Sequence, residues 1–364
     1  MNIINTKIYK GDDHVGIEEA VKILQSDGLV AFPTETVYGL GANALNEGAA
    51  AKIYAAKGRP SDNPLIVHIA DTKSVYELAK EVPQKAVMLM EAFWPGPLTI
   101  ILNKKDIVPA GTTGGLNTVA IRMPSHPVAL ELIRKSGLFI AAPSANTSGR
   151  PSPTEAKHVV EDMTGKIDVI LDGGAVGIGI ESTIVDLTGD IPAILRPGFI
   201  TKTMLESIIG PVEIDPALIN PDPTLRPKAP GMKYTHYAPK GELTIVEEKS
   251  NDSINLSIDY SNKNDIYLVV DKINELAKAK ELQGYKVAVI ASDEYASLYK
   301  CKNILVAGNS DKNETVAAKL YGILRQCDAL DVEYIYSEAF DKGELGGAIM
   351  NRLLKAAGQR VITV

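Results

Sequence analysis

Short apolar runs alternate with segments of helical periodicity along most of the chain. Runs such as 65–69 (LIVHI) are apolar on both faces, which is typical of strands covered by helices on both sides. The alternation predicts an α/β fold built on a twisted, mixed, open sheet. In the first part of the chain we expect strands near residues 28–32, 65–70, 97–102, 118–122, 138–142, 167–171, 183–187 and 193–196. Helices fit residues 14–26, 46–57, 73–81, 84–92, 126–136, 154–163 and 201–209.

The pattern stops between Pro211 and Lys240, where seven prolines fall within thirty residues. Proline neither continues a helix nor donates to a strand ladder, so this stretch is expected to be a linker. Its end, residues 230–239 (PGMKYTHYAP), is rich in aromatic and hydrogen-bonding side chains. We therefore expect residues 228–238 to close over a ligand as a lid, while a linker that merely packs on a domain surface remains the alternative.

After the linker the alternation of strands and helices resumes. Strands fit residues 243–247, 265–270, 286–291, 303–307, 332–336 and 360–364, and helices fit 272–282, 294–300, 314–328 and 345–357. This pattern predicts a second, smaller, Rossmann-like α/β domain. The expected organisation is therefore a domain at 1–210, a linker at 211–240 and a domain at 241–364. No catalytic motif falls in the second domain, for which we expect a regulatory or structural role.

Length and composition agree with this division, because 364 residues exceed one ordinary core. No apolar run approaches the roughly 20 residues that cross a bilayer, and the first residues lack the apolar core of a secretion signal. Two cysteines, Cys301 and Cys327, are too few for a disulfide framework and lack metal-ligand spacing. We expect a cytoplasmic protein without a membrane segment. The net charge of -7 argues against a surface that grips nucleic acid throughout, but leaves room for a local basic cleft.

The first candidate motif, residues 32–42 (FPTETVYGLGA), follows a predicted strand at its carboxyl end, where open α/β sheets bind ligands. It combines hydroxyls, a carboxylate and a phenol with two glycines, Gly39 and Gly41, that would let the backbone approach a ligand. The glycine spacing imitates a dinucleotide fingerprint. We reject that interpretation, because six residues separate the glycines from the strand. A structural turn rich in hydroxyls is the alternative.

The second motif, residues 57–68 (KGRPSDNPLIVH), places Lys57 and Arg59 around a glycine at a helix end. The compact ammonium of a lysine beside the bidentate guanidinium of an arginine is the pair expected around a polyphosphate. Compensation of the helix dipole would explain Lys57 equally well, but not the polar residues beyond it. His68 lies within an apolar strand, where a histidine satisfied inside the core is the ordinary interpretation.

Two further motifs follow strands. Arg122 ends the run 118–124 (TVAIRMP) and needs an anionic partner, which a carboxylate substrate or a structural acidic residue could supply. The loop 141–152 (AAPSANTSGRPS) concentrates hydroxyls, an amide and a guanidinium, which suit anionic oxygens and Mg²⁺-bound phosphates. The chain contains no Walker-type phosphate loop, no nucleophile elbow and no zinc-protease helix.

Taken together, PTETVYGLG, KGRPxxxPL and SANxSG resemble the YrdC-like domain of threonylcarbamoyl-AMP synthases. The linker and the second α/β domain resemble the long, two-domain form of that family. The resemblance implies a nucleotidyltransferase that joins L-threonine, bicarbonate and ATP with release of pyrophosphate, for threonylcarbamoyl-adenosine modification of tRNA. It further implies Mg²⁺ accompanying ATP and transfer of the product to a tRNA threonylcarbamoyl transferase, with only weak RNA binding and no membrane partner. The metal ligands remain unknown.

The resemblance also implies roles for residues that match the family's motifs. The catalytic residues would be Lys57, Arg59 and Arg122. The residues around threonine would be Thr34, His68, Arg122, Ala142 and Ser182. Those along ATP would be Lys57, Ser61, Asn63, Thr118, Ser144, Ser152, Arg196 and Tyr234, with Arg59 close by.

Three other classes are weaker. An RNA-binding module would need aromatic platforms between basic residues, yet aromatic residues make up only 5% of this net acidic chain. A carbamoyl-transfer domain of hydrogenase maturation would need zinc-knuckle cysteines. A nicotinamide dehydrogenase is disfavoured by the glycine spacing.

Overall fold

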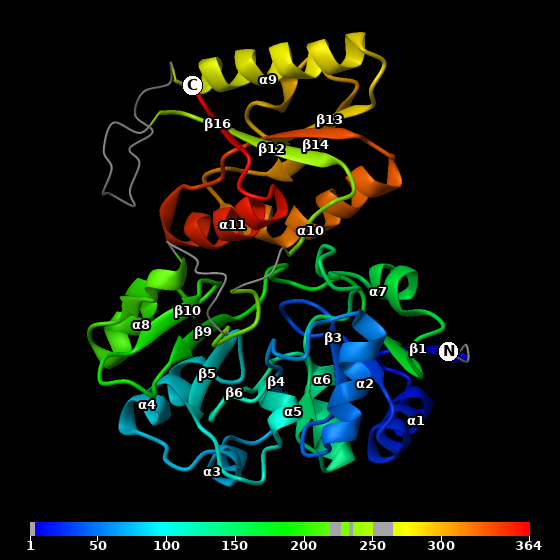
Figure 1. The fold of residues 1–364 in the computed structure, drawn as a ribbon, viewed down its shortest axis with the longest axis vertical. Coiled ribbons are helices and arrows are strands. Elements are labelled where there is room, and N and C mark those ends of the chain that lie inside the picture. Colours follow the sequence, from blue (N-terminus) through cyan, green and yellow to red (C-terminus); the bar gives the residue numbers. More distant parts are fainter. Residues whose placement is uncertain (1–3, 219–226, 233–235, 250–264) are drawn as a thin grey trace. The chain divides into compact units, whose positions relative to one another are not determined.

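The computed structural model describes residues 4–218, 227–232, 236–249 and 265–364 (Figure 1). The chain divides into two compact units. Unit 1 comprises Met1–Ser148 and Ser152–Tyr234, and unit 2 comprises Gly149–Pro151 and Thr235–Val364. Each unit is built on its own sheet.

Unit 1 contains an eleven-stranded mixed sheet in the order β1-β8-β2-β3-β7-β4-β6-β5-β9-β10-β11. The sheet contains parallel pairs such as β4 with β6 and antiparallel pairs such as β5 with β6, so the predicted mixed open sheet is confirmed. The strands are β1 (Lys7–Lys10), β2 (Val30–Phe32), β3 (Gly39–Asn43), β4 (Ile66–His68), β5 (Leu98–Asn103), β6 (Thr118–Arg122), β7 (Ile140–Ala141), β8 (Val169–Asp172), β9 (Thr183–Asp186), β10 (Ala193–Arg196) and β11 (Glu213–Ile214).

One face of this sheet is covered by helices along most of its width. The largest apolar cluster of unit 1 joins residues such as Val67 and Ala141 to side chains of helices α2, α4, α7 and α8. The helices of unit 1 are α1 (His14–Gln25), α2 (Glu47–Lys57), α3 (Val75–Leu78), α4 (Gln84–Phe93), α5 (Ala110–Thr113), α6 (Pro127–Ser136), α7 (Ala156–Met163) and α8 (Lys202–Ile209). Short 3₁₀ turns lie at Thr72–Ser74 and Pro216–Leu218.

The opposite face is covered unevenly. Helices α1 and α6 pack over β2, β7 and β8. The other half of this face carries a separate cluster whose members come from strands and from the linker, namely Ile66, Ile101, Ala120, Ile184, Leu195, Ala229 and, partly buried, Ala193 and Met232. No helical residue belongs to that cluster among the described residues. The described linker residues therefore pack on a half of the sheet that helices do not cover.

Most predicted strands and helices of unit 1 are present within a few residues of their expected positions, but β1, β3, α5 and β11 were not predicted. Strand β3 is instructive, because it contains both glycines of the first motif and pairs with β2 as a hairpin. A Cβ on Gly41 would lie 2.7 Å from Phe32 Cε1 and 2.8 Å from Ile140 Cγ2. The expectation that Gly41 admits a ligand is therefore wrong, since protein side chains occupy that space.

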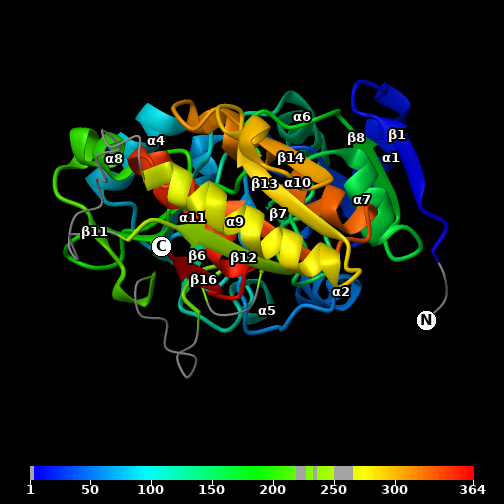
Figure 2. The same ribbon diagram turned by 90° about the horizontal axis from the view of Figure 1, so that it is seen from above.

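Unit 2 contains a five-stranded, all-parallel sheet in the order β14-β13-β15-β12-β16. Helix α9 contacts β12, β13 and β15 from one side, while α10 and α11 lie on the other (Figures 1 and 2). The predicted smaller α/β domain is confirmed. Its elements are β12 (Glu242–Glu247), α9 (Asp265–Leu282), β13 (Val287–Ser292), a 3₁₀ turn (Ala296–Leu298), β14 (Asn303–Gly308), α10 (Asn313–Ala329), β15 (Tyr334–Glu338), α11 (Gly343–Ala356) and β16 (Val361–Thr363).

The strand predicted at 265–270 is wrong, because these residues form the first turns of α9. Their apolar run is too short to separate strand from helix by itself. The buried residues Val269, Val270, Ile273 and Ala277 follow helical spacing, whereas Tyr267 is 54% exposed. Burial on one side of a helix thus replaces the two-sided burial expected of a strand.

Three residues from the first half of the chain belong to unit 2. Arg150 Nη2 lies 2.8 Å from Asp328 Oδ2, and Arg325 Nη2 donates to Pro151 O at 2.6 Å. Asp328 Oδ1 also accepts the backbone N–H of Lys240 at 2.6 Å. Helix α10 therefore holds both Gly149–Pro151 and the residue that leads into β12.

Candidate functional site

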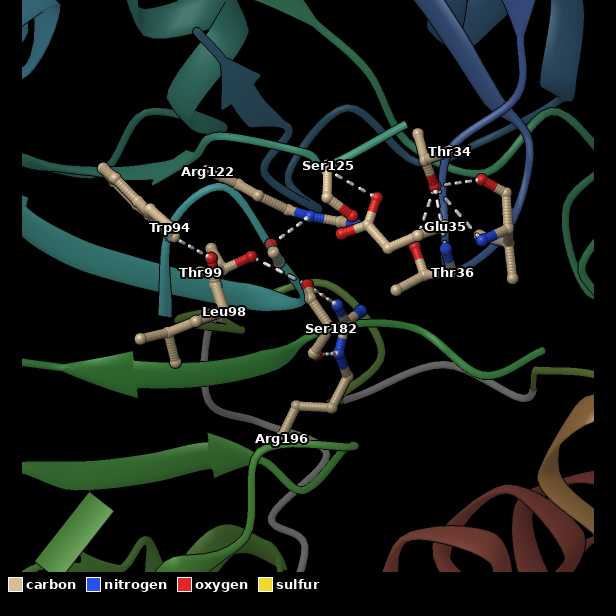
Figure 3. Close-up of polar contacts among 12 residues, drawn as sticks. Thr34, Glu35, Thr36, Trp94, Leu98, Thr99, Arg122, Ser125, Ser182 and Arg196 are labelled. Carbon is tan, nitrogen blue, oxygen red and sulfur yellow. Dashed lines mark hydrogen bonds and ion pairs between the residues drawn. The ribbon is translucent and has the colours of Figure 1, made fainter. Parts of the chain in front are cut away.

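Polar side chains form a row across adjacent strands at one edge of the sheet of unit 1 (Figure 3). His68 ends β4 and is paired with Arg122, which ends β6, and Arg122 is paired in turn with Thr99 of β5. These three side chains share the face that carries Ile66, Ala120 and Ile101, because side chains alternate along a strand. The row therefore lies on the half of the face that helices leave uncovered.

Hydrogen bonds extend this row to β9 and β10. The Thr99 hydroxyl lies 2.7 Å from Ser182 Oγ, immediately before β9. Arg196, which ends β10, donates from Nε to Ser182 O at 3.0 Å and from Nη2 to Ser182 Oγ at 3.1 Å. Two residues predicted for different substrates, Ser182 for threonine and Arg196 for ATP, are thus in direct contact.

Arg122 has an internal anionic partner. Its Nη2 donates to Glu35 Oε1 at 2.7 Å, and its Nε donates to Gly96 O at 3.4 Å. Glu35 Oε2 accepts the backbone N–H of Ser125 at 3.1 Å. Of the two partners left open by the sequence, the structure contains the structural carboxylate, which comes from the PTETVYGLG motif.

The turn before Glu35 is organised by Thr34, which is 2% exposed. Its hydroxyl donates to Val37 O at 2.6 Å and accepts the N–H groups of Thr36 and Val37, each at 3.2 Å. Ala142 lies just beyond β7, and its N–H donates to Ile66 O at 2.9 Å. Ala142 therefore lies level with Ile66, two residues before His68 on β4, and Thr34 shapes the turn whose Glu35 contacts Arg122.

His68 is buried, and this burial lowers the pKa of its imidazole to about 3, with the positive charge of Arg122 lowering it further. Its Nδ1 lies 3.2 Å from Ile66 O. The ring therefore stays neutral at physiological pH and can exchange hydrogen bonds without adding positive charge beside Arg122.

Lys57 occupies the last turn of α2, which ends at Gly58 with φ 63°. Its ammonium donates to the carbonyl oxygens of Ser144 and Asn146, the latter at 2.6 Å. Lys57 is 2% exposed and Arg196 is 5% exposed, so neither of these two cations lies on an exposed loop. The lysine holds the loop 144–148, whose Ser148 N–H donates back to Lys57 O at 2.8 Å.

The loop after α2 closes on itself. Arg59 donates from Nε to Asn63 O at 3.3 Å and from Nη2 to Pro64 O at 3.1 Å. Ser61, between them in sequence, is exposed. Asn63 is 1% exposed, and its side-chain oxygen has no hydrogen-bond partner among the described residues. A buried acceptor without a donor is costly, which makes Asn63 the residue of this loop best suited to receive a ligand N–H.

Three remaining predicted ATP residues are spread more widely. Ser144 forms a bridge with Gly39, and Ser152 donates to Glu181 Oε1 at 2.6 Å. Thr118 begins β6, at the opposite end from Arg122, which places their Cα atoms about 13 Å apart at the usual rise of a strand. The structure therefore does not bring Thr118 into the polar row.

The described part of the linker reaches the same region. Arg196 Nη1 donates to Pro230 O at 3.4 Å, and Ala229 is completely buried against the uncovered half of the sheet. Tyr234 lies outside the described residues. In unit 2, Tyr237 adopts φ 66° and packs its ring 5.0 Å from that of Tyr321. The described ends of the expected lid are thus packed, and its closure over a ligand stays a prediction.

Sequence reasoning missed Thr99 and the pairing of Glu35, and it gave Glu181 no role. A signal for Thr99 was present, because a hydroxyl inside the apolar run 98–102 needs a buried partner. Nothing in the local sequence shows which cation Glu35 meets, since its partner lies 87 residues away.

Two family models match the chain in succession. One, described as "Telomere recombination", covers residues 22–198, and one described as "Threonylcarbamoyl-AMP synthase, C-terminal domain" covers residues 200–358. The threonylcarbamoyl-AMP synthase of Bacillus subtilis is 50% identical over 347 residues, which are 95% of this chain and 94% of that protein. The chain belongs to the threonylcarbamoyl-AMP synthase family.

Other relatives of the family agree. The threonylcarbamoyl-AMP synthase of Pyrococcus abyssi is 48% identical over 349 residues, which are 96% of each chain. A crystal structure of P. abyssi Sua5 complexed with L-threonine matches with a TM-score of 0.88 and 46% identity, covering 100% of this chain and 99% of that one. The two-domain form of the family, predicted from layout, is therefore confirmed.

The described residues contain neither a cluster of metal ligands nor a membrane-spanning helix. No group of three or more His, Cys, Asp or Glu side chains is placed to hold a metal ion there. No helix in the same residues is long and apolar enough to cross a membrane.

Proposed function

We propose that this enzyme joins L-threonine, bicarbonate and ATP into threonylcarbamoyl-AMP and pyrophosphate, for the modification of an adenosine of tRNA. The observation that carries the proposal is the row His68–Arg122–Thr99–Ser182–Arg196, which spans five adjacent strands on the uncovered half of the sheet. It places Arg122, a cation that can bind a carboxylate, near hydroxyls that can contact an amino acid. A second buried cation, Arg196, lies next to the Ser182 hydroxyl.

In the proposed reaction the threonine amine attacks bicarbonate, and a C–O bond breaks with loss of water to leave a carbamate. A carbamate oxygen then attacks the α-phosphorus of ATP while the bond to pyrophosphate breaks. No protein nucleophile is required, because the substrate supplies the attacking oxygen. The enzyme would act by positioning the reactants and by stabilising the negative charge that develops on the phosphate.

The roles of individual residues follow from this reaction. Arg122 would bind the threonine carboxylate, while Thr34 and Ser182 orient the amino acid and His68 and Ala142 line its pocket. Lys57, Arg59 and Arg196 would stabilise the phosphates. The other proposed ATP residues are Ser61, Asn63, Thr118, Ser144, Ser152 and Tyr234.

Magnesium would enter with ATP rather than in a cage built by the protein, because the described residues contain no cluster of metal ligands. Mg²⁺ commonly keeps several waters and takes one or two carboxylates beside the substrate phosphates. Glu181, which accepts from Ser152 Oγ at 2.6 Å, is a carboxylate in contact with a proposed ATP residue. When bound, the ion would neutralise phosphate charge, and Glu181 would hold it.

The product is a mixed anhydride that a tRNA threonylcarbamoyl transferase would consume. The test is mass spectrometry of a mixture of protein, ATP, L-threonine and bicarbonate, together with an assay for pyrophosphate. We expect threonylcarbamoyl-AMP, and pyrophosphate release that needs both L-threonine and bicarbonate. Release of pyrophosphate at an equal rate without either of them would contradict the proposed reaction.

A further inference from the structure

Glu35 is a partly buried acidic residue of the first motif for which the proposed reaction has no role. Its two carboxylate oxygens accept from Arg122 Nη2 at 2.7 Å and from the Ser125 N–H at 3.1 Å (Figure 3). The side chains of Glu35 and Arg122 are 13% and 5% exposed. The pair is therefore largely withdrawn from water, where opposite charges attract more strongly than on a surface.

The backbone around Glu35 is fixed on both sides. Ile178 donates its N–H to Glu35 O at 2.9 Å, and the Thr34 hydroxyl accepts the N–H of Thr36 at 3.2 Å. A ligand that displaced the carboxylate from Arg122 would leave it with the Ser125 N–H in a mostly buried position. Leaving a buried charge without its counter-ion is strongly unfavourable, so we expect the pair to persist when a ligand binds.

The guanidinium of Arg122 can hold Glu35 and a second carboxylate together. It carries five N–H groups, of which Nε–H is directed to Gly96 O and one Nη2–H to Glu35. Nη1 has no hydrogen-bond partner among the described residues. A substrate carboxylate can therefore take Nη1–H and the second Nη2–H as a bidentate pair.

The charges of this pair match one kind of ligand. Arg122 and Glu35 cancel, and His68 is neutral because burial lowers the pKa of its imidazole to about 3. A zwitterionic amino acid head brings an ammonium for the negative pole and a carboxylate for the positive pole. A simple hydroxy acid brings only the carboxylate, so the occupied site would carry a net negative charge.

We propose that Glu35 is a specificity-determining residue whose carboxylate balances Arg122, so that the site accepts the zwitterionic head of an α-amino acid and discriminates against carboxylates that lack the α-ammonium. This inference rests on the proposed function, because it assigns the threonine carboxylate to Arg122. It adds a negatively charged group, the Glu35 carboxylate, for the ammonium of the same amino acid.

The test compares two ligands in the full-length protein by calorimetric binding: L-threonine and (R)-3-hydroxybutanoate, which has the same skeleton without the α-amino group. The variants are Glu35→Gln, which removes the charge, and Glu35→Asp, which keeps it. Glu19→Gln is the matched control, because Glu19 is a partly exposed residue paired with Lys7 at 2.6 Å. Melting temperature is measured for each variant to separate folding from selectivity.

We expect wild type, Glu35→Asp and Glu19→Gln to prefer threonine. In Glu35→Gln the preference should fall by roughly tenfold or more, with hydroxybutanoate binding unchanged or tightened, because the uncompensated Arg122 favours an anion. A preference in Glu35→Gln within about twofold of wild type would overturn the inference. If Glu35→Gln melts below the assay temperature, the folded Glu35→Asp variant is used instead. A preference of that variant for threonine over hydroxybutanoate supports the inference, and loss of this preference overturns it. A wild-type protein that binds neither ligand would contradict the proposed function as well.

Discussion

The hydroxyl of Thr99 lies 2.7 Å from Ser182 Oγ, and both residues are fully buried. Thr99 belongs to β5, whereas Ser182 precedes β9 and also accepts from Arg196 at 3.1 Å. Ser182 thus joins Thr99 to Arg196, the residue proposed for ATP, while Thr99 itself binds neither substrate in our assignment.

Replacing Thr99 by valine should lower kcat/KM for threonine by roughly three- to tenfold, because Ser182 would lose one of the two bonds that orient its hydroxyl. Valine keeps the β-branched shape, so the strand should be preserved. The measurement is steady-state pyrophosphate release at varied threonine concentration.

Thr112→Val is the matched control for this change. Thr112 is also fully buried, and its hydroxyl donates to Ala44 O at 2.6 Å, away from the polar row. Both variants should lose about 1 kcal/mol of stability, but only Thr99→Val should lose activity. Equal losses of activity in the two variants would show that Thr99 acts through the fold alone.

Lys57→Met should weaken ATP binding and also lower the free energy of unfolding by roughly 2–3 kcal/mol, because the ammonium holds the carbonyls of Ser144 and Asn146. Urea unfolding and ATP titration measure the two effects. Lys52→Met, on the same helix but exposed, is the control and should change neither by much.

These two measurements separate the phosphate role predicted for Lys57 from its structural role in holding the loop 144–148. If Lys57→Met loses stability but binds ATP as tightly as wild type does, Lys57 only stabilises the loop 144–148. A variant that loses both would agree with the phosphate role.

The stability of unit 1 should depend on pH through His68. Its pKa is about 3 in the folded protein against an ordinary value of 6.5, so the unfolded chain binds a proton more readily. Stability from this group is therefore complete above pH 6.5 and lost as pH falls toward 3. Between pH 7 and 4.5, wild type should lose roughly 2–3 kcal/mol more than His68→Gln.

Denaturant unfolding at both pH values measures this difference, with the exposed His14 changed to glutamine as control. If His68→Gln and wild type lost stability in parallel over this range, the imidazole would not be buried in its neutral form.

A chain that ends at residue 210 should be less stable than one that ends at residue 232. The longer chain keeps Ala229, which is completely buried with Ile66, Ile101 and Leu195. Exposing their apolar surface costs about 25 cal/mol per Å², so we expect a melting temperature several degrees lower for the shorter chain. Equal melting temperatures and equal threonine affinities would support the alternative in which the linker is a spacer.

The sequence predicted the architecture well where the burial pattern was long and one-sided. Helices such as α6 and α10 were found within two residues, because their apolar positions repeat with helical spacing. For α9, the prediction was wrong only at the start of the helix. The helix expected at 272–282 is part of α9, whereas residues 265–270, which are apolar around most of the helix, were expected to form a strand. The prediction also failed for β3, because glycines weaken a strand pattern and were interpreted as a loop.

The site was predicted as a set of loops, and the structure joins these loops in pairs. Glu35 of the first motif contacts Arg122, and Lys57 of the second holds the loop that contains Ser144. What could not be predicted was which polar groups satisfy one another. The bonds of Arg122 to Glu35 and of Thr99 to Ser182 join residues 87 and 83 positions apart. Such pairs follow from strand order, which local propensity does not contain.

The membership of Gly149–Pro151 in unit 2 has a consequence for how this protein can be recombined. A chimera that exchanges only residues 235–364 with a relative would separate Asp328 and Arg325 from the Arg150 and Pro151 with which they are matched. A functional exchange must carry two pieces of chain, one of them three residues long. In evolution, the same dependence would tie changes in helix α10 to changes in a loop nearly two hundred positions earlier, although the two fall in different halves of the gene.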